Sequence, residues 1–411
     1  MAQSVLGSVA LHYRALWSKK RQLAGVQLFV EEVSPGAEGS HLLRTLSELW
    51  SGESPSVLLS ARHPQLLQEL LAHAGAQDPM IEVPGRWLAQ GALLGAVNAA
   101  HEHGARLVAS GSPSELRALG GAARAFDRQC VQLGTEDAAL ALRASMQARE
   151  DAARGRFGST AAASPVPAGS LVAGAAGRAL VEHALDQQGA WAVAGWPAED
   201  ILHRFNGHPV PPTRRAILRV MSALDQEQSL DRIEYLLAQE ATLAYRLLAY
   251  LNSAGLGLRN GVASLRHGVM MLGYRTLNGW LAEQLTMASE DRDLDPVNLG
   301  LGLRAALAAE LMDAGVEDEL RHEVFLTGML SQIDALQGQT LRALLSRIPL
   351  PERVPDALVR GTGPYAAVLR LAQAMERDPS HSLINPTEAA GLTLEESNRA
   401  LLRVLSAAST S

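Results

Sequence analysis

The spacing of apolar residues changes near residue 200, and this change restricts the fold more than any other feature of the chain. Before it, short apolar runs alternate with helical patterns. From Arg214 onward, apolar residues recur every three or four positions, and no convincing strand is found. The 411 residues also exceed what one compact domain usually holds. The sequence therefore predicts an α/β half followed by an all-helical half, with the boundary in the Pro-rich stretch 195–212.

The first half has the pattern of repeated strand–helix units. Two apolar runs, 8–16 and 25–33, flank a polar turn and predict a hairpin. Further short strands are predicted at 56–61, 79–85, 105–111, 130–134, 170–174 and within 190–200. Strands separated by helices at this spacing favour a parallel sheet or a barrel. The small, Pro-rich stretch 155–170 is predicted to be a loop inside this domain.

Composition excludes several classes of protein. The net charge of −7 argues against a general nucleic-acid binder, which needs a basic surface to neutralise phosphates. A single cysteine, Cys130, excludes an intrachain disulfide and fits a reducing cytoplasm. Residues 1–25 lack the order of charges and apolar residues typical of a signal peptide. There is no uninterrupted apolar run of about 18 residues, so a membrane span is not predicted. We therefore expect a cytoplasmic protein.

One stretch of the helical half, residues 251–280, carries a specific motif. It has the order of a helix end, a Gly-rich loop and a second helix that begins near Ser264 as its N-cap. This order resembles the signature of the HDOD domain, a helical relative of the HD phosphohydrolases, and the resemblance covers roughly 200–395. The positions that carry it are Asn252, Ser253, Gly255, Ser264, Arg266, His267 and Gly273, with Gly268 where Ala is usual.

The upstream half then resembles an EAL domain, as in EAL–HDOD signalling proteins. The resemblance lies in the hairpin, the βα units and a last strand followed by Gly195-Trp196-Pro197. It implies a shortened, degenerate EAL-like β/α barrel followed by an all-α HDOD domain. The expected boundaries are 1–197 for the barrel, 198–395 for the HDOD domain and 396–411 for a C-terminal tail.

The resemblance to EAL domains also implies where a metal site has been lost. Intact EAL domains hydrolyse cyclic di-GMP with metal ions held by carboxylates at strand ends, and such hydrolysis needs several of them. Only Glu82 remains as an acidic candidate, and we expect it to be structural. The other aligned positions carry no carboxylate, at Gln27, Ser110, Gln132 and Gly174.

The helical half lacks the corresponding HD chemistry. HD enzymes hold metal through a His-Asp dyad and further ligands. The dyad positions carry Ser331 and Gln332 here, and Asp334 has no histidine in its segment. His267 and His322 are isolated in sequence and are interpreted as structural residues. No metal site and no cofactor are predicted in either half.

The motif of residues 251–280 has two interpretations. In the first, its glycines let two helices approach, Asn252 satisfies loop backbone groups, and Arg266 reaches helix C-terminal carbonyls. In the second, the junction forms a surface for a partner. Tyr245, Tyr250 and Trp280 are predicted to be core residues. The pair Arg214-Arg215 is interpreted as a solvated helix start, with contact to an anion as the alternative.

Three classes of function follow from these patterns. The favoured one is a non-catalytic signalling scaffold that acts through protein–protein interaction. The second is a receptor that binds cyclic di-GMP without hydrolysis, and the third is a phosphohydrolase with unrecognised ligands. The sequence names neither the partner nor the pathway, and it leaves self-association open.

Overall fold

The computed structural model describes residues 4–34, 38–88, 91, 93–154, 164–253, 261–312, 318–377 and 380–408. The chain divides into two compact units. The first consists of Met1–Asp200, Met375–Ile384 and Thr393–Ser411, and the second of Ile201–Ala374 and Asn385–Leu392. We call them the barrel unit and the helical unit and describe each by itself.

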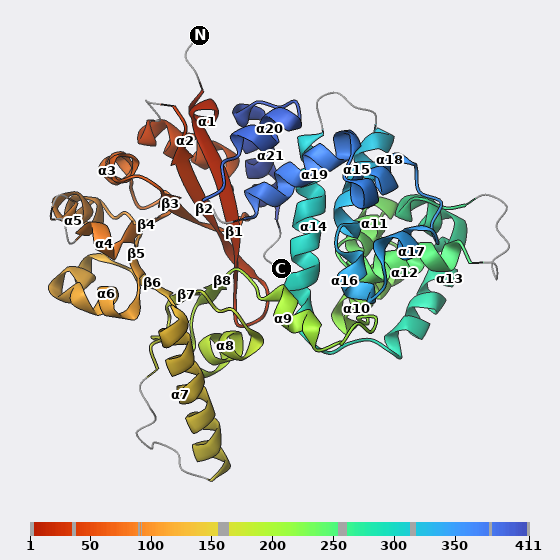
Figure 1. The fold of residues 1–411 in the computed structure, drawn as a ribbon, viewed down its shortest axis with the longest axis horizontal. Coiled ribbons are helices and arrows are strands. Elements are labelled where there is room, and N and C mark those ends of the chain that lie inside the picture. The colour runs from red at the N-terminus through yellow and green to blue at the C-terminus, as the bar shows by residue number, and fades with distance from the viewer. Residues whose placement is uncertain are drawn as a thin grey trace. The chain divides into compact units, whose positions relative to one another are not determined.

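Within the described residues, eight strands of the barrel unit close into a barrel in the order β1 to β8 (Figure 1). β1 is antiparallel to both of its neighbours, β2 and β8, and all other neighbouring strands are parallel. The strands are β1 Val9–Trp17, β2 Leu23–Glu32, β3 Ser56–Ala61, β4 Met80–Pro84, β5 Leu107–Gly111, β6 Arg128–Gln132, β7 Leu171–Ala173 and β8 Ala192–Ala194. The last two strands have three residues each, which fits the expected shortened barrel.

The helices of this unit lie on the outside of the barrel, and most of them connect successive strands. They are α1 Val5–Ser8, α2 Gly39–Leu49, α3 Pro64–His73, α4 Gly85–Leu88, α5 Leu94–Glu102, α6 Pro113–Ala118, α7 Thr135–Ala153, α8 Arg178–Glu182 and α9 Ala198–His203, with single 3₁₀ and π turns at Gly120–Ala125 and His183–Gln187. The interior is filled by alternate residues of the strands, because successive strand residues point to opposite faces. Leu16, Leu58, Met80, Val108 and Leu171 belong to this interior core.

A C-terminal helix completes the barrel unit. α21 (Leu394–Ala407) packs against α1 and β1 (Figure 1). Its Asn398 is fully buried and donates from Nδ2 to the carbonyls of Leu6 and Val9, both at 2.7 Å. Its Oδ1 accepts from the backbone N–H of Leu11 at 3.1 Å. The stretch expected to be a tail, 396–411, therefore lies largely in a packed helix of the barrel unit.

The helical unit is built from helices whose apolar stripes face a common core. They are α10 Arg214–Asp225, α11 Leu230–Ala238, α12 Ala241–Leu251, α13 Leu265–Leu285, α14 Leu294–Leu311, α15 Asp318–Leu330, α16 Ile333–Gln337, α17 Leu341–Leu345, α18 Arg353–Pro355, α19 Gly363–Met375 and α20 Ile384–Ala389, with a π turn at Asp356–Arg360. The predicted class, a β/α barrel followed by an all-helical region, is confirmed.

Two glycines determine the course of α13 and its packing against α12. Gly273 interrupts the helix with φ 69° and ψ 159°, a conformation that L side chains avoid, so α13 is two helical segments across a kink. Gly268 lies so close to Leu251 of α12 that a Cβ there would come within 2.4 Å of its Cδ1. The glycines at these positions thus shape the junction of α12 and α13. Gly255 and residues 155–163 of the predicted loop lie outside the described residues.

Candidate functional site

The interior of the barrel holds a small polar cluster. Gln27 of β2 donates from Nε2 to Glu82 Oε2 of β4 at 2.8 Å and to Ser60 Oγ of β3 at 3.0 Å. Ser60 Oγ also donates to the same carboxylate oxygen of Glu82. All three side chains are buried. The one acidic residue of the predicted EAL positions therefore lies on a strand inside the barrel and is hydrogen-bonded to side chains of β2 and β3.

The other predicted EAL positions add no carboxylate to this cluster. Ser110 is a buried residue of β5, Gln132 ends β6 at an exposed position, and Gly174 follows β7. Ser110 Oγ and Gln27 Oε1 have no hydrogen-bond partner within the described chain. Among the described residues, no group of three or more His, Cys, Asp or Glu side chains is placed to hold a metal ion.

Cys130 on β6 faces the same interior. Burial raises the pKa of its thiol well above the usual value, and the charge of Glu82 raises it further, against a smaller opposing effect of Arg14. A thiol in this setting stays protonated, and a protonated thiol is a poor nucleophile and metal ligand. The site therefore has the chemistry of a core, with one carboxylate held by side-chain donors.

A second feature of the barrel unit was not predicted from the sequence. His12 on β1 pairs with Phe29 near the C-terminal end of β2, and its side chain is fully buried. Its Nε2 lies 2.9 Å from the carbonyl oxygen of His381. Next to it, Tyr13 donates to Glu376 at 3.1 Å. A segment far along the chain thus contacts the barrel at the end where the ligands of parallel barrels bind.

In the helical unit, Asn252 ties together the two sides of the motif. It follows α12, and its Nδ2 donates to the carbonyls of Leu248 and Val262, both at 2.7 Å. Its Oδ1 accepts from the N–H of Val262 at 2.8 Å. The neighbouring Ser253 donates its hydroxyl to the carbonyl of Tyr250. Asn252 therefore satisfies backbone groups on both sides of residues 254–260, as the first interpretation expected.

Ser264 and Arg266 open the second helix of the motif. Ser264 is the N-cap of α13, and its side chain accepts from the N–H of His267, which confirms the predicted cap. The expectation for Arg266 was wrong. Its guanidinium donates to two carboxylates of α11, Asp231 at 2.5 Å and Glu234 at 3.2 Å, because α13 packs beside α11 rather than at a helix end.

His322 belongs to the same surface. Its Nε2 lies 3.7 Å from Glu234 Oε1, so it is isolated in sequence but not in space. His267 is exposed, and so are Met270 and Met271, at 66% and 43% of their surface. Positions 267, 270 and 271 share one face of a helix. We call these three residues the α13 face.

The two dyad positions of HD enzymes hold no metal chemistry. Ser331 donates its hydroxyl to the carbonyl of Gly328 and accepts from Arg304 at 3.3 Å. Gln332 precedes α16. The predicted core aromatics behave as expected for Tyr245 and Trp280, which are buried. Tyr250 is partly buried and stacks on Trp280 with ring centres 5.8 Å apart.

The comparison with protein families identifies the second half of the chain. Residues 209–341 match the HDOD domain, so the C-terminal part of the chain carries this domain. The match lies within the helical unit and contains the whole predicted motif of residues 251–280. The match to the HDOD domain, the barrel that precedes it and the similarity to the Vibrio cholerae protein CdgJ together confirm the predicted resemblance to EAL–HDOD proteins.

Two curated proteins resemble parts of the chain. The cyclic di-GMP phosphodiesterase CdgJ of Vibrio cholerae is 30% identical over 148 residues, which is 36% of this chain and 34% of CdgJ. The uncharacterized protein YuxH of Bacillus subtilis is 23% identical over 177 residues, 42% of this chain and 43% of YuxH. The chain thus spans less than half the length of either relative.

Among solved structures, the response regulator MmoQ from Methylococcus capsulatus covers 47% of this chain and 98% of its own length. It is 19% identical to this chain, with a TM-score of 0.40. In the described part of the chain, helices long and apolar enough to cross a membrane are absent.

Proposed function

We propose that the chain is a non-catalytic signalling protein of the cyclic di-GMP-related EAL–HDOD type, in which the helical unit binds a protein partner. One observation carries the proposal. The only acidic side chain at the expected catalytic positions, Glu82, is already occupied by hydrogen bonds from Gln27 and Ser60. Two metal ions need several carboxylates to neutralise the phosphate and activate water.

The first test is hydrolysis. Purified full chain with Mg²⁺ or Mn²⁺ is expected to leave cyclic di-GMP intact, measured by chromatography of the nucleotides. Turnover on the order of 1 per second or more that is lost in Glu82→Ala and kept in Glu136→Ala would overturn the proposal. Glu136 is the control, because it is an acidic residue at the start of α7 that is exposed and lies outside the cluster of Gln27, Ser60 and Glu82.

Partner binding is proposed for the α13 face together with Asn252, Gly255 and Arg266. The two methionines support this location, because flexible thioether side chains suit a surface that adapts to a partner. They are exposed although the rest of α13 contributes Leu277 and Trp280 to the core. An exposed apolar pair beside a histidine is costly to leave in water and gains free energy when covered.

The second test compares two exposed methionines. Full-length chain is used as bait, and captured proteins are quantified for wild type, Met270→Ser and Met287→Ser. Met287 is exposed to 62%, close to the 66% of Met270, but lies beyond the end of α13. We expect a specific protein to be lost with Met270→Ser and retained with Met287→Ser. Equal capture by all three would remove the α13 face from the proposal.

A receptor that binds cyclic di-GMP without hydrolysis is the second candidate. It is favoured by the similarity to CdgJ, which is named as a cyclic di-GMP phosphodiesterase. The occupied Glu82 and the contact of His381 with His12 weigh against a nucleotide site inside the barrel. Titration calorimetry with cyclic di-GMP distinguishes the two candidate functions. The variant His12→Ala is titrated as well, because it should change the affinity only if the nucleotide binds inside the barrel.

A further inference from the structure

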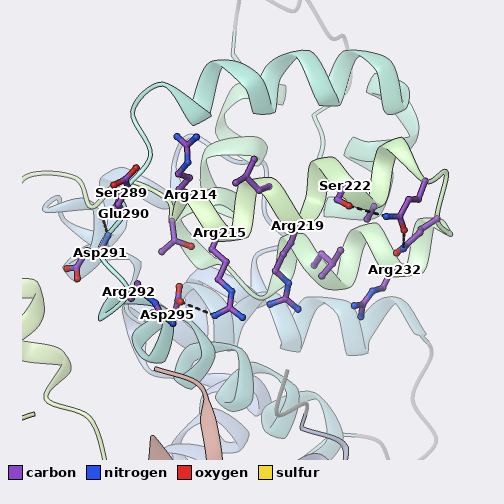
Figure 2. A pocket seen from close by; sticks show the side chains of 16 residues that line it. Arg214, Arg215, Arg219, Ser222, Arg232, Ser289, Glu290, Asp291, Arg292 and Asp295 are labelled. Carbon is purple, nitrogen blue, oxygen red and sulfur yellow. Dashed lines mark hydrogen bonds and ion pairs between the residues drawn. The ribbon is translucent and has the colours of Figure 1, made fainter. Parts of the chain in front are cut away.

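A groove of about 700 Å³ in the helical unit lies outside the sites considered so far (Figure 2). Its walls are α10, α11 and the segment 289–295, which includes the first residues of α14. Apolar contact is offered by Leu218 and Leu236, and Leu218 is exposed to 43%. The volume falls in the range of about 300–1,000 Å³ that is usual for small-molecule sites.

Arginines dominate the lining of this groove. Figure 2 shows Arg215, Arg219 and Arg232 projecting on the same side of α10 and α11, in a row that begins beside Asp295. Arg215 and Arg219 come four residues apart on α10 and therefore lie on one helix face. Arg232 of α11 lines the same groove as Arg215 and Arg219. Its place beside these two residues could not be predicted from their spacing in the sequence.

The charge of this row is only partly balanced. Arg215 lies 3.5 Å from Asp295, which is an ion pair of ordinary length. Within the part of the chain that the structure describes, Arg219 and Arg232 form no ion pair with an acidic side chain, although Arg232 stacks over Tyr235 at 5.2 Å. Three guanidinium groups and one carboxylate leave a local charge of about +2 by formal count. Asp291, also in the lining, is paired with Arg204.

The electrostatics of Arg219 agree with this count. Burial lowers the pKa of its guanidinium, and the charges of Arg215 and Arg232 lower it further. Asp295 and Tyr235 oppose this with smaller effects. Arginine stays protonated in proteins. The half-buried charge of Arg219 is therefore held close to those of Arg215 and Arg232. This arrangement is electrostatically unfavourable until an anion binds.

A solvated helix surface is the simplest alternative, but it does not explain why three arginines from two helices converge in a groove. An acidic peptide would match the charge. The guanidinium fork, however, fits phosphate bidentately, and the groove has the volume of a small molecule rather than of an extended chain.

We propose that this groove, formed by Arg215, Arg219 and Arg232, binds a small phosphorylated ligand with at least two negative charges, such as a nucleotide. The phosphates lie against the arginine row, and the apolar wall at Leu218 and Leu236 accepts the less polar part of the ligand. This inference goes beyond the proposed function, because neither hydrolysis in the barrel nor partner binding at the α13 face depends on it.

Inorganic pyrophosphate is the first probe, because it presents the proposed anionic groups without a base. Titration calorimetry on the full chain at low salt is expected to show saturable binding. The affinity should fall at least tenfold in Arg219→Gln and in Arg232→Gln, and it should weaken as salt is raised because the contact is ionic. Arg275→Gln is the matched control, since Arg275 is an exposed arginine of the same unit outside the groove.

Folding of the variants is checked by melting temperature. Since the neighbouring arginines disfavour the charge of Arg219, its replacement by glutamine should leave the melting temperature unchanged or raise it. No saturable binding of pyrophosphate at millimolar concentration, or equal affinity in wild type and a folded Arg219→Gln, overturns the proposal. Binding of a polyglutamate peptide at this row in place of pyrophosphate overturns it as well.

A second set of titrations identifies the class of ligand. GDP and cyclic di-GMP are compared with pyrophosphate on wild type and on Leu218→Ser. A nucleotide that binds more tightly than pyrophosphate, and loses this gain in Leu218→Ser, supports a base or sugar on the apolar wall. Equal affinity for all three probes contradicts the nucleotide part of the proposal. Because these variants lie in the helical unit, the result is separate from any cyclic di-GMP binding that responds to His12→Ala.

Discussion

Glu82 of the barrel unit and Glu240 of the helical unit are both buried carboxylates, and they are held in different ways. Glu82 of the barrel unit, on β4, accepts from the side chains of Gln27 on β2 and Ser60 on β3. Glu240 of the helical unit precedes α12 and accepts from the backbone N–H groups of Leu243 at 2.6 Å and Thr213 at 3.3 Å, and from the side chain of Asn298.

This difference extends beyond the two carboxylates. In the barrel unit, the side chains of Glu82 and Asn398 are hydrogen-bonded to strands and helices of the same core, so they act on stability. In the helical unit, Glu240 and Asn252 hold helix ends, and two arginines of the groove, Arg219 and Arg232, form no ion pair with an acidic side chain of the described residues. Buried, bonded groups therefore indicate structure, and unbalanced exposed groups indicate where a ligand or partner binds.

The sharpest test of the barrel side of this comparison is Asn398→Ala. It leaves two buried carbonyls and one buried N–H without partners, and each unsatisfied group costs about 1–3 kcal/mol. We expect a loss of about 4 kcal/mol in the free energy of unfolding, measured by urea denaturation. The control is Asn278→Ala, whose amide bonds to Asp225 at an exposed site and should cost less than about 1 kcal/mol. A loss below 1 kcal/mol for Asn398→Ala would contradict the assigned role of α21.

The pH dependence of stability tests the buried carboxylate of the helical unit. Burial raises the pKa of Glu240 to about 7, against the lowering effect of the backbone donors Leu243 and Thr213. In the unfolded chain this carboxyl has an ordinary pKa near 4.5. Between these values the folded state binds the extra proton, so stability falls as pH rises from about 4.5 to 7 and stays low above it.

The expected size of this loss is about 3 kcal/mol, since one pKa unit corresponds to about 1.4 kcal/mol. It is measured by denaturant unfolding of the full chain at pH 5 and pH 8, for wild type and Glu240→Gln. The variant is expected to be less stable overall, because an amide cannot accept from all three donors, but to lose this pH dependence. The same pH dependence in both proteins would assign it to other groups.

Asn252→Ala gives the counterpart of Asn398→Ala in the helical unit. Both asparagines make three hydrogen bonds to backbone groups, but Asn252 is only partly buried. Water can replace some of the lost bonds there, so we expect a cost of about 2 kcal/mol, less than for Asn398→Ala. If the two substitutions cost the same in urea denaturation, burial does not distinguish the two units in the way we infer.

Arg266→Ala has the smallest expected effect on stability. Its side chain is 41% exposed, and its partner Asp231 is 78% exposed, so the ion pair is screened by solvent. Exposed ion pairs contribute about 0–1 kcal/mol, and we expect a loss within this range that shrinks further at high salt. Melting temperature and partner capture are measured on the same variant. Lost capture with an unchanged melting temperature supports a binding surface. A large drop in melting temperature, with capture restored on cooling, supports a purely structural role.

Part of this structure is readable from local sequence. The strand at 56–61 matches β3, since a short apolar run bounded by turn residues has few other solutions. The helix start at Ser264 is also predictable from local sequence, because an N-cap depends only on the next three residues. These features need no knowledge of distant contacts.

The parts that were missed depend on distant contacts. The sequence of α21 is an ordinary amphipathic helix, and nothing in it says that Asn398 bonds to residues near position 10. Arg266 forms an ion pair with Asp231, which lies 35 residues earlier in α11, instead of the expected contact with helix C-terminal carbonyls. One member of the arginine row, Arg215, was noted in the sequence as part of the pair Arg214-Arg215, but Arg232 is brought beside Arg215 and Arg219 only by the packing of α10 and α11.

The packing of α21 on the barrel unit has a consequence for synthesis of the protein. The chain leaves the barrel unit at residue 200 and returns to it at 375 and again at 393, so the helical unit is an insertion between two parts of one fold. At about 5–20 residues per second, roughly 10–40 s pass on the ribosome between the end of β8 and the appearance of Asn398. During that interval the backbone groups of residues 6, 9 and 11 lack their native partner. The barrel unit is therefore completed only by segments that are translated after residues 201–374 of the helical unit.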